Sequence, residues 1–249
     1  MTKNIALITG ASRGIGAATA KLLAQKDLHI VINFRSNKKA AQDVASNIIK
    51  NGGSAQIIQA DISQEHEITE LFAQIDKIDG ALTMLVNNAG ILFQQSSIEN
   101  LSAQRITQVM ATNVTGCILC CKEAVKRMST NYGGNGGAIV NVSSAASRLG
   151  APGEYIDYAA SKGAVDTLTT GLSLEVAAQN IRVNGVRPGF IYTEMHADGG
   201  EPNRVDRVSE NIPMKRGGKP EEVAQAIVWL LSDNASYVTG SHIDLAGGK

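Results

Sequence analysis

The sequence has no excess of charge of either sign, because its 249 residues include 23 Lys and Arg and 23 Asp and Glu. Proteins that coat a nucleic-acid backbone usually carry a basic excess, so nucleic acid is not an expected partner. No apolar run approaches the roughly 20 residues that span a bilayer. The first ten residues, MTKNIALITG, hold an apolar run too short for the core of a secretory signal. We therefore expect a cytoplasmic protein that does not enter membranes.

Cysteine is also scarce, and all three cysteines fall in the segment GCILCC. An odd number in one cluster is not a disulfide framework. The spacing of Cys117 and Cys120 occurs in zinc and redox sites, but no second pair and no nearby histidine completes such a site. At helical spacing, Cys117, Cys120 and Cys121 extend one apolar face. We therefore predict buried, unreactive thiols and no metal site.

The apolar residues occur in seven runs of strand length, which alternate with helix-length segments. The runs are 4–9, 29–33, 55–60, 82–88, 138–143, 182–186 and 242–247, and the helical segments begin near Gly14, Asn37, Gln64, Ser102, Tyr155 and Glu221. This alternation predicts an α/β fold, a mostly parallel sheet with helices on both faces. Seven such strands use most of the chain, so we expect a single domain over residues 1–249.

One long segment does not fit the alternation. Residues 193–213 contain glycine, proline and mixed charges but few residues suited to a core. A stretch of this length without a strand in a compact domain is usually functional or mobile. We interpret residues 193–213 as a lid over the substrate, inserted within the domain.

A glycine-rich turn follows the first apolar run. Gly10, Gly14 and Gly16 are spaced G-x-x-x-G-x-G, where the first strand should lead into the first helix. Glycine permits a tight turn and lets phosphate oxygens approach the backbone. The helix N-terminus then offers free N–H groups to an anion. The position of the turn at this junction indicates a dinucleotide site.

The end of the second apolar run indicates which dinucleotide is bound. An NAD-specific site places a carboxylate there for the ribose 2′-hydroxyl. Here the sequence reads VINFRSNKK, and no acidic residue occurs between Asp27 and Asp43. Asn33, Arg35 and Ser36, with Arg13 from the glycine turn, match a 2′-phosphate instead. We therefore favour NADP over NAD.

The segment YIDYAASK holds two tyrosines and one lysine. Four residues advance a helix by about 6 Å and return to the same face, so Tyr158 and Lys162 should point the same way, whereas Tyr155 should lie too far from Lys162. An adjacent ammonium lowers the pKa of a phenol, which makes Tyr158 a candidate proton donor near neutral pH.

Two further side chains are candidates for the same site. Ser143 and Ser144 end the strand that precedes this helix, and a hydroxyl there faces the crevice where ligands bind. Asn113 lies on an apolar helical stripe, where a buried amide needs partners. It could hold a water that connects to Lys162, or it could make an ordinary interhelical hydrogen bond.

Seven pieces of the chain together resemble the short-chain dehydrogenase/reductase family. They are TGASRGIG (9–16), Asp61 in ADIS, NNAG (87–90), Asn113, Ser144, YAASK (158–162) and RPGFIYT (187–193). They cover nearly the whole chain in the family's order, and NFRSN (33–37) is similar to the NADP-preferring members. The resemblance implies a doubly wound Rossmann fold with seven strands in the order 3-2-1-4-5-6-7, and usually a homotetramer.

The resemblance also implies a role for each matching residue. Tyr158 would be the general acid in carbonyl reduction, and Ser144 would hydrogen-bond the carbonyl. Lys162 would lower the pKa of the tyrosine and hold the nicotinamide ribose, and Asn113 would complete a proton relay through water. The residues expected at NADP(H) are Gly10, Ser12, Arg13, Gly14, Ile15, Gly16, Asn33, Arg35, Ser36, Asp61, Ile62, Asn87, Ala89, Gly90, Tyr158, Lys162, Pro188, Gly189, Ile191 and Thr193.

The substrate is less well defined by the resemblance. Ketoacyl-ACP reductases, the most similar subgroup, carry basic residues beside the active-site entrance, where this chain has residues 131–137 (NYGGNGG) and Gln179-Asn180. We therefore interpret the chain as an NADPH-dependent carbonyl reductase or alcohol dehydrogenase acting on a small molecule. The alternatives are a 3-oxoacyl-ACP reductase, a non-catalytic nucleotide-binding regulator and a sugar-nucleotide epimerase. His196 in the lid could touch substrate, although an exposed loop histidine is the simpler interpretation.

Overall fold

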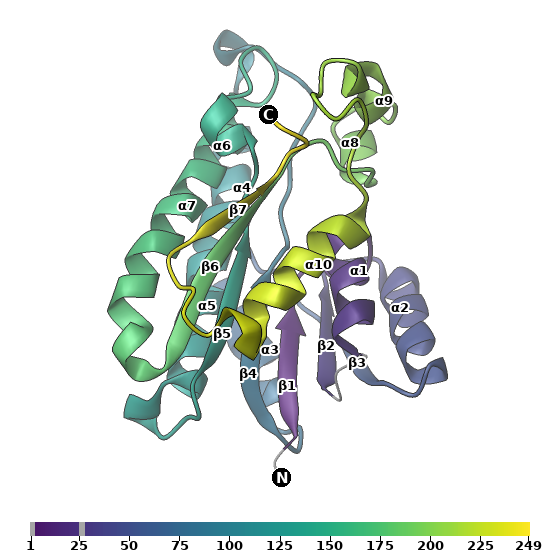
Figure 1. The fold of residues 1–249 in the computed structure, drawn as a ribbon. Coiled ribbons are helices and arrows are strands. Elements are labelled where there is room, and N and C mark those ends of the chain that lie inside the picture. Colours follow the sequence, from purple (N-terminus) through teal and green to yellow (C-terminus); the bar gives the residue numbers. More distant parts are fainter. Residues whose placement is uncertain (1–2, 25–27) are drawn as a thin grey trace.

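The structure, a computed structural model, describes residues 3–24 and 28–249. Within these ranges a sheet of seven strands forms the centre of the molecule (Figure 1). The strands are β1 Asn4–Ile8, β2 His29–Phe34, β3 Ser54–Gln59, β4 Ala81–Asn87, β5 Gly137–Val142, β6 Ile181–Pro188 and β7 His242–Leu245. They lie in the order β3-β2-β1-β4-β5-β6-β7, and every neighbouring pair is parallel. The predicted fold class and strand order are confirmed, and each strand lies on one of the seven apolar runs.

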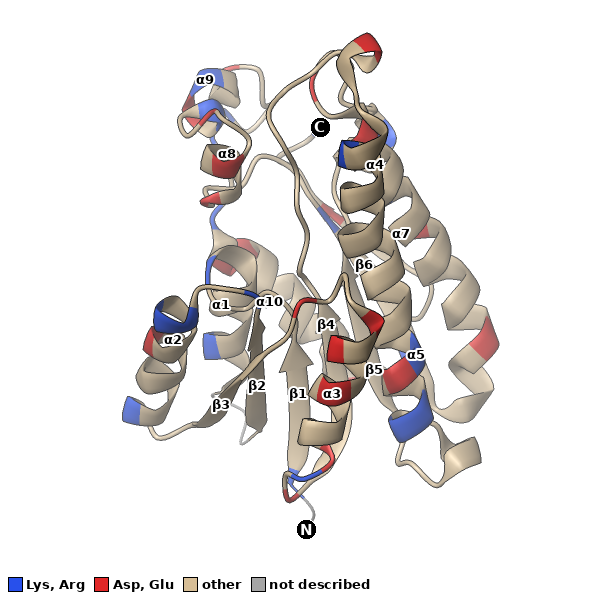
Figure 2. Ribbon diagram, turned by 180° about the vertical axis from the view of Figure 1, so that it is seen from behind, with Lys and Arg blue, Asp and Glu red and all other residues tan. Residues whose placement is uncertain are grey.

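Helices cover both faces of the sheet. One face carries α1 Gly14–Leu23, α2 Lys38–Lys50 and α10 Pro220–Leu231, and the other carries α3 Glu65–Ile75, α4 Ala103–Met110, α5 Cys117–Met128 and α7 Ile156–Val176 (Figures 1 and 2). A π-helical turn, η3 Ala111–Gly116, joins α4 to α5. The shorter elements are α6 Ala146–Leu149, α8 Met195–Asp198, α9 Arg204–Ser209 and the 3₁₀ turns η2 Ile98–Asn100, η4 Thr130–Tyr132, η5 Ala177–Gln179 and η6 Asp233–Ala235.

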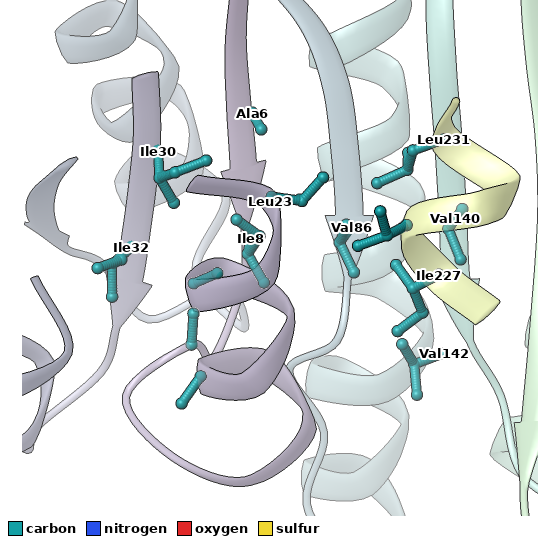
Figure 3. Packing of buried hydrophobic residues seen from close by; sticks show 14 of the residues in the cluster. Ala6, Ile8, Leu23, Ile30, Ile32, Val86, Val140, Val142, Ile227 and Leu231 are labelled. Carbon is teal, nitrogen blue, oxygen red and sulfur yellow. The ribbon is translucent and has the colours of Figure 1, made fainter. Parts of the chain in front are cut away.

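The core consists of two apolar layers, one on each side of the sheet. Successive strand residues point to opposite faces, so Ala6 and Ile8 of β1 pack toward α1 and α10 while Ile5 and Leu7 pack toward α3 and α5. Figure 3 shows the first layer, in which Leu23 of α1 and the α10 side chains cover the strands. Burial on both faces explains why the strands read as continuous apolar runs.

The three cysteines are buried, as predicted, and Cys120 and Cys121 belong to the second layer. Cys117, Cys120 and Cys121 on α5 are all buried, and their thiols are free. Burial raises the pKa of the Cys120 thiol far above its ordinary value, which makes it unreactive. In the part of the chain that the structure describes, no group of His, Cys, Asp and Glu could hold a metal ion. None of the described helices combines the length and hydropathy needed to cross a membrane.

The predicted lid contains two short helices, α8 and α9, and no strand. In the sequence this segment lies between β6 and α10. In space it lies beyond the carboxyl ends of the strands (Figure 1). In Figure 2, basic and acidic residues lie next to one another over α8 and α9. Ion pairs, such as that of Arg204 with Glu154, and the buried apolar side chains of Val205, Val208 and Ile212 therefore both hold this segment.

Candidate active site

A cavity of about 880 Å³ lies at the carboxyl ends of the strands. Loops that follow β1 to β6 all contribute to it, as expected for ligand binding in an open parallel sheet. Of the residues that the sequence suggested, these line it: Gly10, Ser12, Arg13, Gly14, Ile15, Asn33, Arg35, Ser36, Asp61, Ile62, Ala89, Gly90, Ser144, Tyr158, Lys162, Pro188, Gly189, Ile191 and Thr193. Gly16, Asn87 and Asn113 do not line it.

The glycine turn packs directly against the loop after β4. Gly10 has a φ of +62°, and a Cβ there would lie 2.8 Å from the Cα of Ala89, so a side chain has neither the conformation nor the space. Gly16 contributes through packing, because its Cβ would lie 2.5 Å from Nδ2 of Asn88. Asn88 was not foreseen from the sequence. Its Nδ2 donates to the carbonyls of Thr9 and Gly10, which fixes the turn that forms this end of the cavity.

The end of β2 differs in one respect from the prediction. Asn33 lies at the cavity, but it is only 2% exposed and its amide is already used. Its Oδ1 accepts from Gly10 N, and its Nδ2 donates to the carbonyls of Ala60 and Ile58. Asn33 therefore positions the glycine turn rather than offering a free donor to a phosphate. Arg35 and Ser36 remain exposed at the cavity, and no carboxylate accompanies them at this strand end.

Arg13 is paired with the lid. Its guanidinium donates to the carboxylate of Asp198 in α8, and both side chains are about half exposed. The lid approaches the same turn at Gly14, where a Cβ would lie 3.3 Å from Cγ2 of Thr193. The residue expected to meet a 2′-phosphate is thus also a point of lid attachment. The sequence pattern of residues 193–213 contained no signal for this pair.

Tyr158 and Lys162 point the same way from α7, as the spacing predicted. The Lys162 Nζ lies 5.5 Å from the centroid of the Tyr158 ring and donates a 2.8 Å hydrogen bond to the Val142 carbonyl. Both side chains are buried, and burial lowers the pKa of Lys162 from 10.5 to about 8.

The pKa of Tyr158 departs from the prediction. Burial raises it from 10.0 to about 12, whereas a hydrogen bond with Ser144 opposes this shift. The expected lowering does not occur in the protein alone, because burial removes the hydration that a phenolate needs. The isolated chain therefore holds Tyr158 as a neutral phenol, which is the form that donates a proton.

The two serines that end β5 have different surroundings. Ser143 is buried and donates to the Lys162 carbonyl, which holds β5 against α7. Ser144 lines the cavity beside Tyr158, and its Oγ accepts from Ala146 N. Ser143 also borders the cavity, but its hydroxyl already donates to the Lys162 carbonyl, so Ser144 is better placed to reach a ligand.

Asn113 is buried in the π-helical turn η3 and does not reach the cavity. Its Oδ1 accepts from Ile91 N, while its Nδ2 donates to the Ile91 carbonyl and to Oγ of Ser161. Its amide thus joins η3 to the loop after β4 and to α7. A Cβ on Gly90 would lie 3.4 Å from both Asn113 Oδ1 and Lys162 Nζ, so these two polar atoms flank the same glycine.

Asn87 also differs from its expected place at the ribose. It is 6% exposed, and its Nδ2 donates to Oδ1 of Asn141 on β5 at 2.9 Å. Asn141 in turn donates to Thr169 on α7 at 2.9 Å. Asn87 therefore braces the sheet beneath the cavity. A buried strand residue and a ligand-facing loop residue cannot be distinguished in the motif NNAG without the structure.

The part of the cavity beside residues 193–213 includes residues that the sequence pattern did not single out. Arg204 of α9 is 6% exposed and lies over the rings of Tyr155 and Phe190, 5.1 Å and 5.4 Å from their centroids. His196 also lines this part. It is half-buried, and its Nε2 donates to the Ile191 carbonyl at 3.0 Å, so its interpretation as an exposed loop residue was wrong.

The expected place of the carrier-docking positions is also corrected. Gln179 and Asn180 precede β6, and residues 131–137 precede or begin β5, so both segments lie at the amino ends of these strands, whereas the cavity lies at the carboxyl ends. Gln179 accepts from Ser129, and Asn180 donates to the Asn135 carbonyl. Within one chain these positions do not border the active-site entrance.

Similarity to known proteins extends over the whole chain. A family model described as enoyl-(acyl carrier protein) reductase matches residues 10–249. The uncharacterized oxidoreductase YgfF of Escherichia coli K12 is 69% identical, over 98% of this chain and 99% of its own length. Glucose 1-dehydrogenase 2 of Bacillus subtilis is 36% identical, over 100% of this chain and 95% of its own. A 3-oxoacyl-[acyl-carrier-protein] reductase of Synechocystis is 37% identical, over 100% and 97%.

Proposed function

Because the chain belongs to the short-chain dehydrogenase/reductase family of oxidoreductases, we propose that it interconverts a carbonyl and an alcohol on a small molecule with NADP(H). The observation that carries this proposal is that Ser144, Tyr158 and Lys162 line the same cavity as the glycine turn. This cavity would thus bring together a proton donor, a hydroxyl for the carbonyl oxygen and a dinucleotide site.

The cavity has the features that a nicotinamide dinucleotide needs. Gly10 and Gly14 leave the backbone open where phosphates approach, and both have positive φ. Arg35 and Ser36 offer a cation and a hydroxyl at the end of β2, where a carboxylate would select NAD. Among the lining residues, Asp61 and Ile62 would contact the adenine, and Pro188, Gly189, Ile191 and Thr193 would contact the nicotinamide. When bound, the dinucleotide supplies or accepts the hydride.

The side chains of this chain would manage the proton. Ser144 would hydrogen-bond the carbonyl oxygen, and Tyr158 would donate its phenolic proton to that oxygen as the alcohol forms. Lys162 would stabilise the phenolate that remains, because an ammonium close to it favours the charged form. Burial of both groups strengthens this interaction, since the local dielectric is low. Asn113 would hold η3 and the Ile91 loop in place around Lys162.

The second candidate function is reduction of 3-oxoacyl-ACP, which the printed name of the Synechocystis relative suggests. That activity requires docking of an acidic carrier. The positions that the resemblance assigns to basic residues hold the uncharged Gln179 and Asn180, and within one chain they lie away from the cavity, so they lend no support to carrier docking. A non-catalytic regulator is a third possibility, but the gathering of Ser144, Tyr158 and Lys162 in one cavity favours an enzyme.

A turnover screen tests the proposed function. Ketones, ketoesters, aldoses, acetoacetyl-CoA and acetoacetyl-ACP would each be incubated with NADPH and with NADH, and cofactor oxidation followed by absorbance. We expect turnover of a free small carbonyl with NADPH. Turnover confined to acetoacetyl-ACP would establish the carrier-protein alternative, and absence of turnover with saturable NADPH binding would favour a regulator.

The proposed assembly is a homotetramer. Its support is the exposure of apolar side chains on the helices that cover one face: Leu174 of α7 is 79% exposed and Ile118 of α5 is 43% exposed. Gly163 and Gly171 of α7 have no neighbouring atoms within 4 Å of a Cβ position, so a second helix has room to approach. Light scattering on the purified protein measures the assembly directly.

A further inference from the structure

The substrate end of the cavity has an apolar lining. Beyond Ser144 and Tyr158 the cavity is bordered by Leu92, Phe93, Leu149, Tyr155, Phe190 and Met195. These come from the loop after β4, from α6 and its following loop, from the loop after β6 (Phe190) and from the lid (Met195). Apolar and aromatic side chains favour a ligand of the same character, because both lose contact with water when they meet.

One cation interrupts this lining, and it is fully paired. Arg204 donates to both carboxylate oxygens of Glu154, which precedes α7, and to Oε2 of Glu201 at 3.2 Å. Arg207 donates to Glu201 as well. We call Glu154, Glu201, Arg204 and Arg207 the lid ion-pair cluster. It contains two carboxylates and two guanidiniums, so its formal charge is zero.

The four members of the cluster differ in their access to the cavity. Arg204 and Glu154 line it, whereas Glu201 and Arg207 do not. The Arg204 side chain is 7% exposed, but that of Arg207 is 55% exposed. Arg207 holds the pKa of Glu201 at about 2, so Glu201 is ionised at neutral pH. Within the cluster, Glu154 is thus the only carboxylate that faces the cavity beside Arg204.

Among the described residues beside Tyr158, Lys162 also lines the cavity, but its ammonium already donates to the Val142 carbonyl and serves the phenol. Burial and the charge of Arg204 lower the pKa of His196, so it is uncharged at neutral pH. The ammonium of Lys249 lies 5.8 Å from the centroid of Phe190, but Lys249 does not line the cavity. A substrate carboxylate beside Arg204 would therefore lose its hydration and meet Glu154, without gaining an unpaired guanidinium.

From this arrangement we propose that the site selects neutral carbonyl compounds with apolar substituents over keto acids, and that Glu154 enforces the selection by neutralising Arg204. The inference rests on the proposed function and names its substrate class. A site can discriminate by repelling the wrong ligand as well as by attracting the right one. Glu154 is then a specificity-determining residue, whereas Ser144 and Tyr158 act on the carbonyl itself.

The test compares two probes that share one reacting carbonyl, ethyl benzoylformate and benzoylformate. With NADPH, kcat/KM for the ester should exceed that for the acid by at least about tenfold in the unmodified protein. Glu154→Gln leaves Arg204 with an excess positive charge at the cavity, and the ratio of kcat/KM for acid over ester should rise by about tenfold or more. The NADPH dissociation constant, measured by fluorescence, shows that this variant is folded.

Two further variants distinguish an effect of the charge beside the cavity from a general disturbance of the lid ion-pair cluster. Glu201→Gln changes the net charge by the same amount, but the excess falls on exposed Arg207, so the acid-to-ester ratio should shift by less than about twofold. The double variant Glu154→Gln with Arg204→Gln is neutral again, and its ratio should return toward that of the unmodified protein.

The outcomes distinguish this inference from the proposed function. Preference of the unmodified protein for benzoylformate, or equal ratio changes in Glu154→Gln and Glu201→Gln, would overturn the substrate-class inference and leave carbonyl reduction intact. No turnover of either probe with NADPH or NADH, in protein that binds the cofactor, would overturn both.

Discussion

The ammonium nitrogen of Lys162 lies 5.5 Å from the centroid of the Tyr158 ring, one helical turn away on α7. Both groups are buried at the wall of one cavity, and each has a pKa displaced toward its neutral form. Burial therefore opposes the formation of a phenolate and an ammonium, whereas their mutual attraction would favour the charged pair. This balance is typical of functional sites, where perturbed pKa values gather.

Replacing Tyr158 by phenylalanine should remove the proton donor and little else. We expect kcat for carbonyl reduction to fall by about 10²- to 10⁴-fold, the usual contribution of a positioned general acid. The NADPH dissociation constant should remain within about threefold, because the backbone that forms the glycine turn is untouched. Tyr155→Phe removes a hydroxyl from the same cavity and is the matched control. Near-normal turnover by Tyr158→Phe would reject the assignment of the acid.

Replacing Lys162 by methionine should remove activity, and it should also remove the destabilisation that results from burying an ammonium group. The pKa of Lys162 falls from 10.5 to about 8 on folding, so the unfolded chain binds more protons between these values. The free energy of unfolding of the unmodified protein should therefore rise as pH increases from 8 to 10.5. Below pH 8, burying the Lys162 ammonium lowers the free energy of unfolding by about 3 kcal/mol. By pH 9.5 this loss should be roughly half as large.

The stability difference between Lys162→Met and the unmodified protein reports this cost. Urea unfolding would be measured for both proteins at pH 7 and pH 9.5. The variant loses the hydrogen bond to Val142, which lowers its free energy of unfolding by the same amount at both pH values. Relative to the unmodified protein, the variant should therefore be more stable at pH 7 than at pH 9.5. Lys126→Met, at a largely exposed lysine, should show no such change with pH. A stability difference independent of pH would contradict a buried, perturbed ammonium.

The fold was predictable because each strand is buried on both faces and therefore appears as an uninterrupted apolar run. The carboxyl ends of those runs then gave the site its place, which is why Gly10, Arg35, Ser144 and Tyr158 line the cavity. The spacing of four between Tyr158 and Lys162 fixed their common direction. These features depend on local sequence and on a general property of parallel sheets.

Other features depend on contacts between distant segments and could not be predicted. Asn33, Asn87 and Asn113 carry polar amides at suggestive positions, but their partners lie on other strands or helices. Arg204 belongs to a lid whose sequence has no regular pattern, and Glu154 is fifty residues away. The pKa of Tyr158 follows from its burial, which a helical spacing does not reveal.

Arg35→Ala tests the preference for NADP. The guanidinium is exposed at the end of β2, beside Ser36 and without a neighbouring carboxylate at that strand end. A charge-assisted hydrogen bond to a 2′-phosphate contributes about 1.5–3 kcal/mol, so the NADPH dissociation constant should increase by about tenfold or more. The constant for NADH should change by less than about twofold. Lys38→Ala is the control, because it removes an adjacent cation that does not line the cavity. Equal losses of affinity for NADPH and NADH in Arg35→Ala would exclude a 2′-phosphate contact.

Asp198→Asn should strengthen NADPH binding. Arg13 is paired with Asp198, so a phosphate that approaches Arg13 competes with the lid carboxylate. Loss of one half-exposed ion pair and of one negative charge should lower the NADPH dissociation constant by about two- to fivefold. Glu210→Gln removes the same charge from an exposed part of the lid and should have a smaller effect. Weaker binding by Asp198→Asn, in calorimetric titrations, would contradict competition and indicate that the pair holds the lid over bound cofactor.

Arg105 and Asp157 form a second ion pair that bears directly on Tyr158. Asp157 precedes Tyr158, and its side chain is 2% exposed. Its Oδ1 accepts from Tyr158 N, and both of its oxygens accept from Arg105 of α4, which also donates to the Gln94 carbonyl. The pair thus anchors the first turn of α7 to α4 and to the loop after β4. Arg105 is a positioning residue, because neither it nor Asp157 lines the cavity.

Removing Arg105 alone should disturb Tyr158 through charge rather than through contact. Arg105→Met leaves the buried Asp157 carboxylate without its cation, bonded to the backbone N–H of Tyr158, and a negative charge on the neighbouring residue disfavours the phenolate. Alcohol oxidation, which requires the phenolate as base, should therefore lose more activity than carbonyl reduction, and its pH profile should shift upward. Adding Asp157→Asn removes the stranded charge and should return the pH profile toward that of the unmodified protein. A purely structural defect would lower the rates of alcohol oxidation and carbonyl reduction alike and would persist in the double variant. Equal losses of activity in the two directions, without a shift of the pH profile, would therefore exclude this electrostatic role.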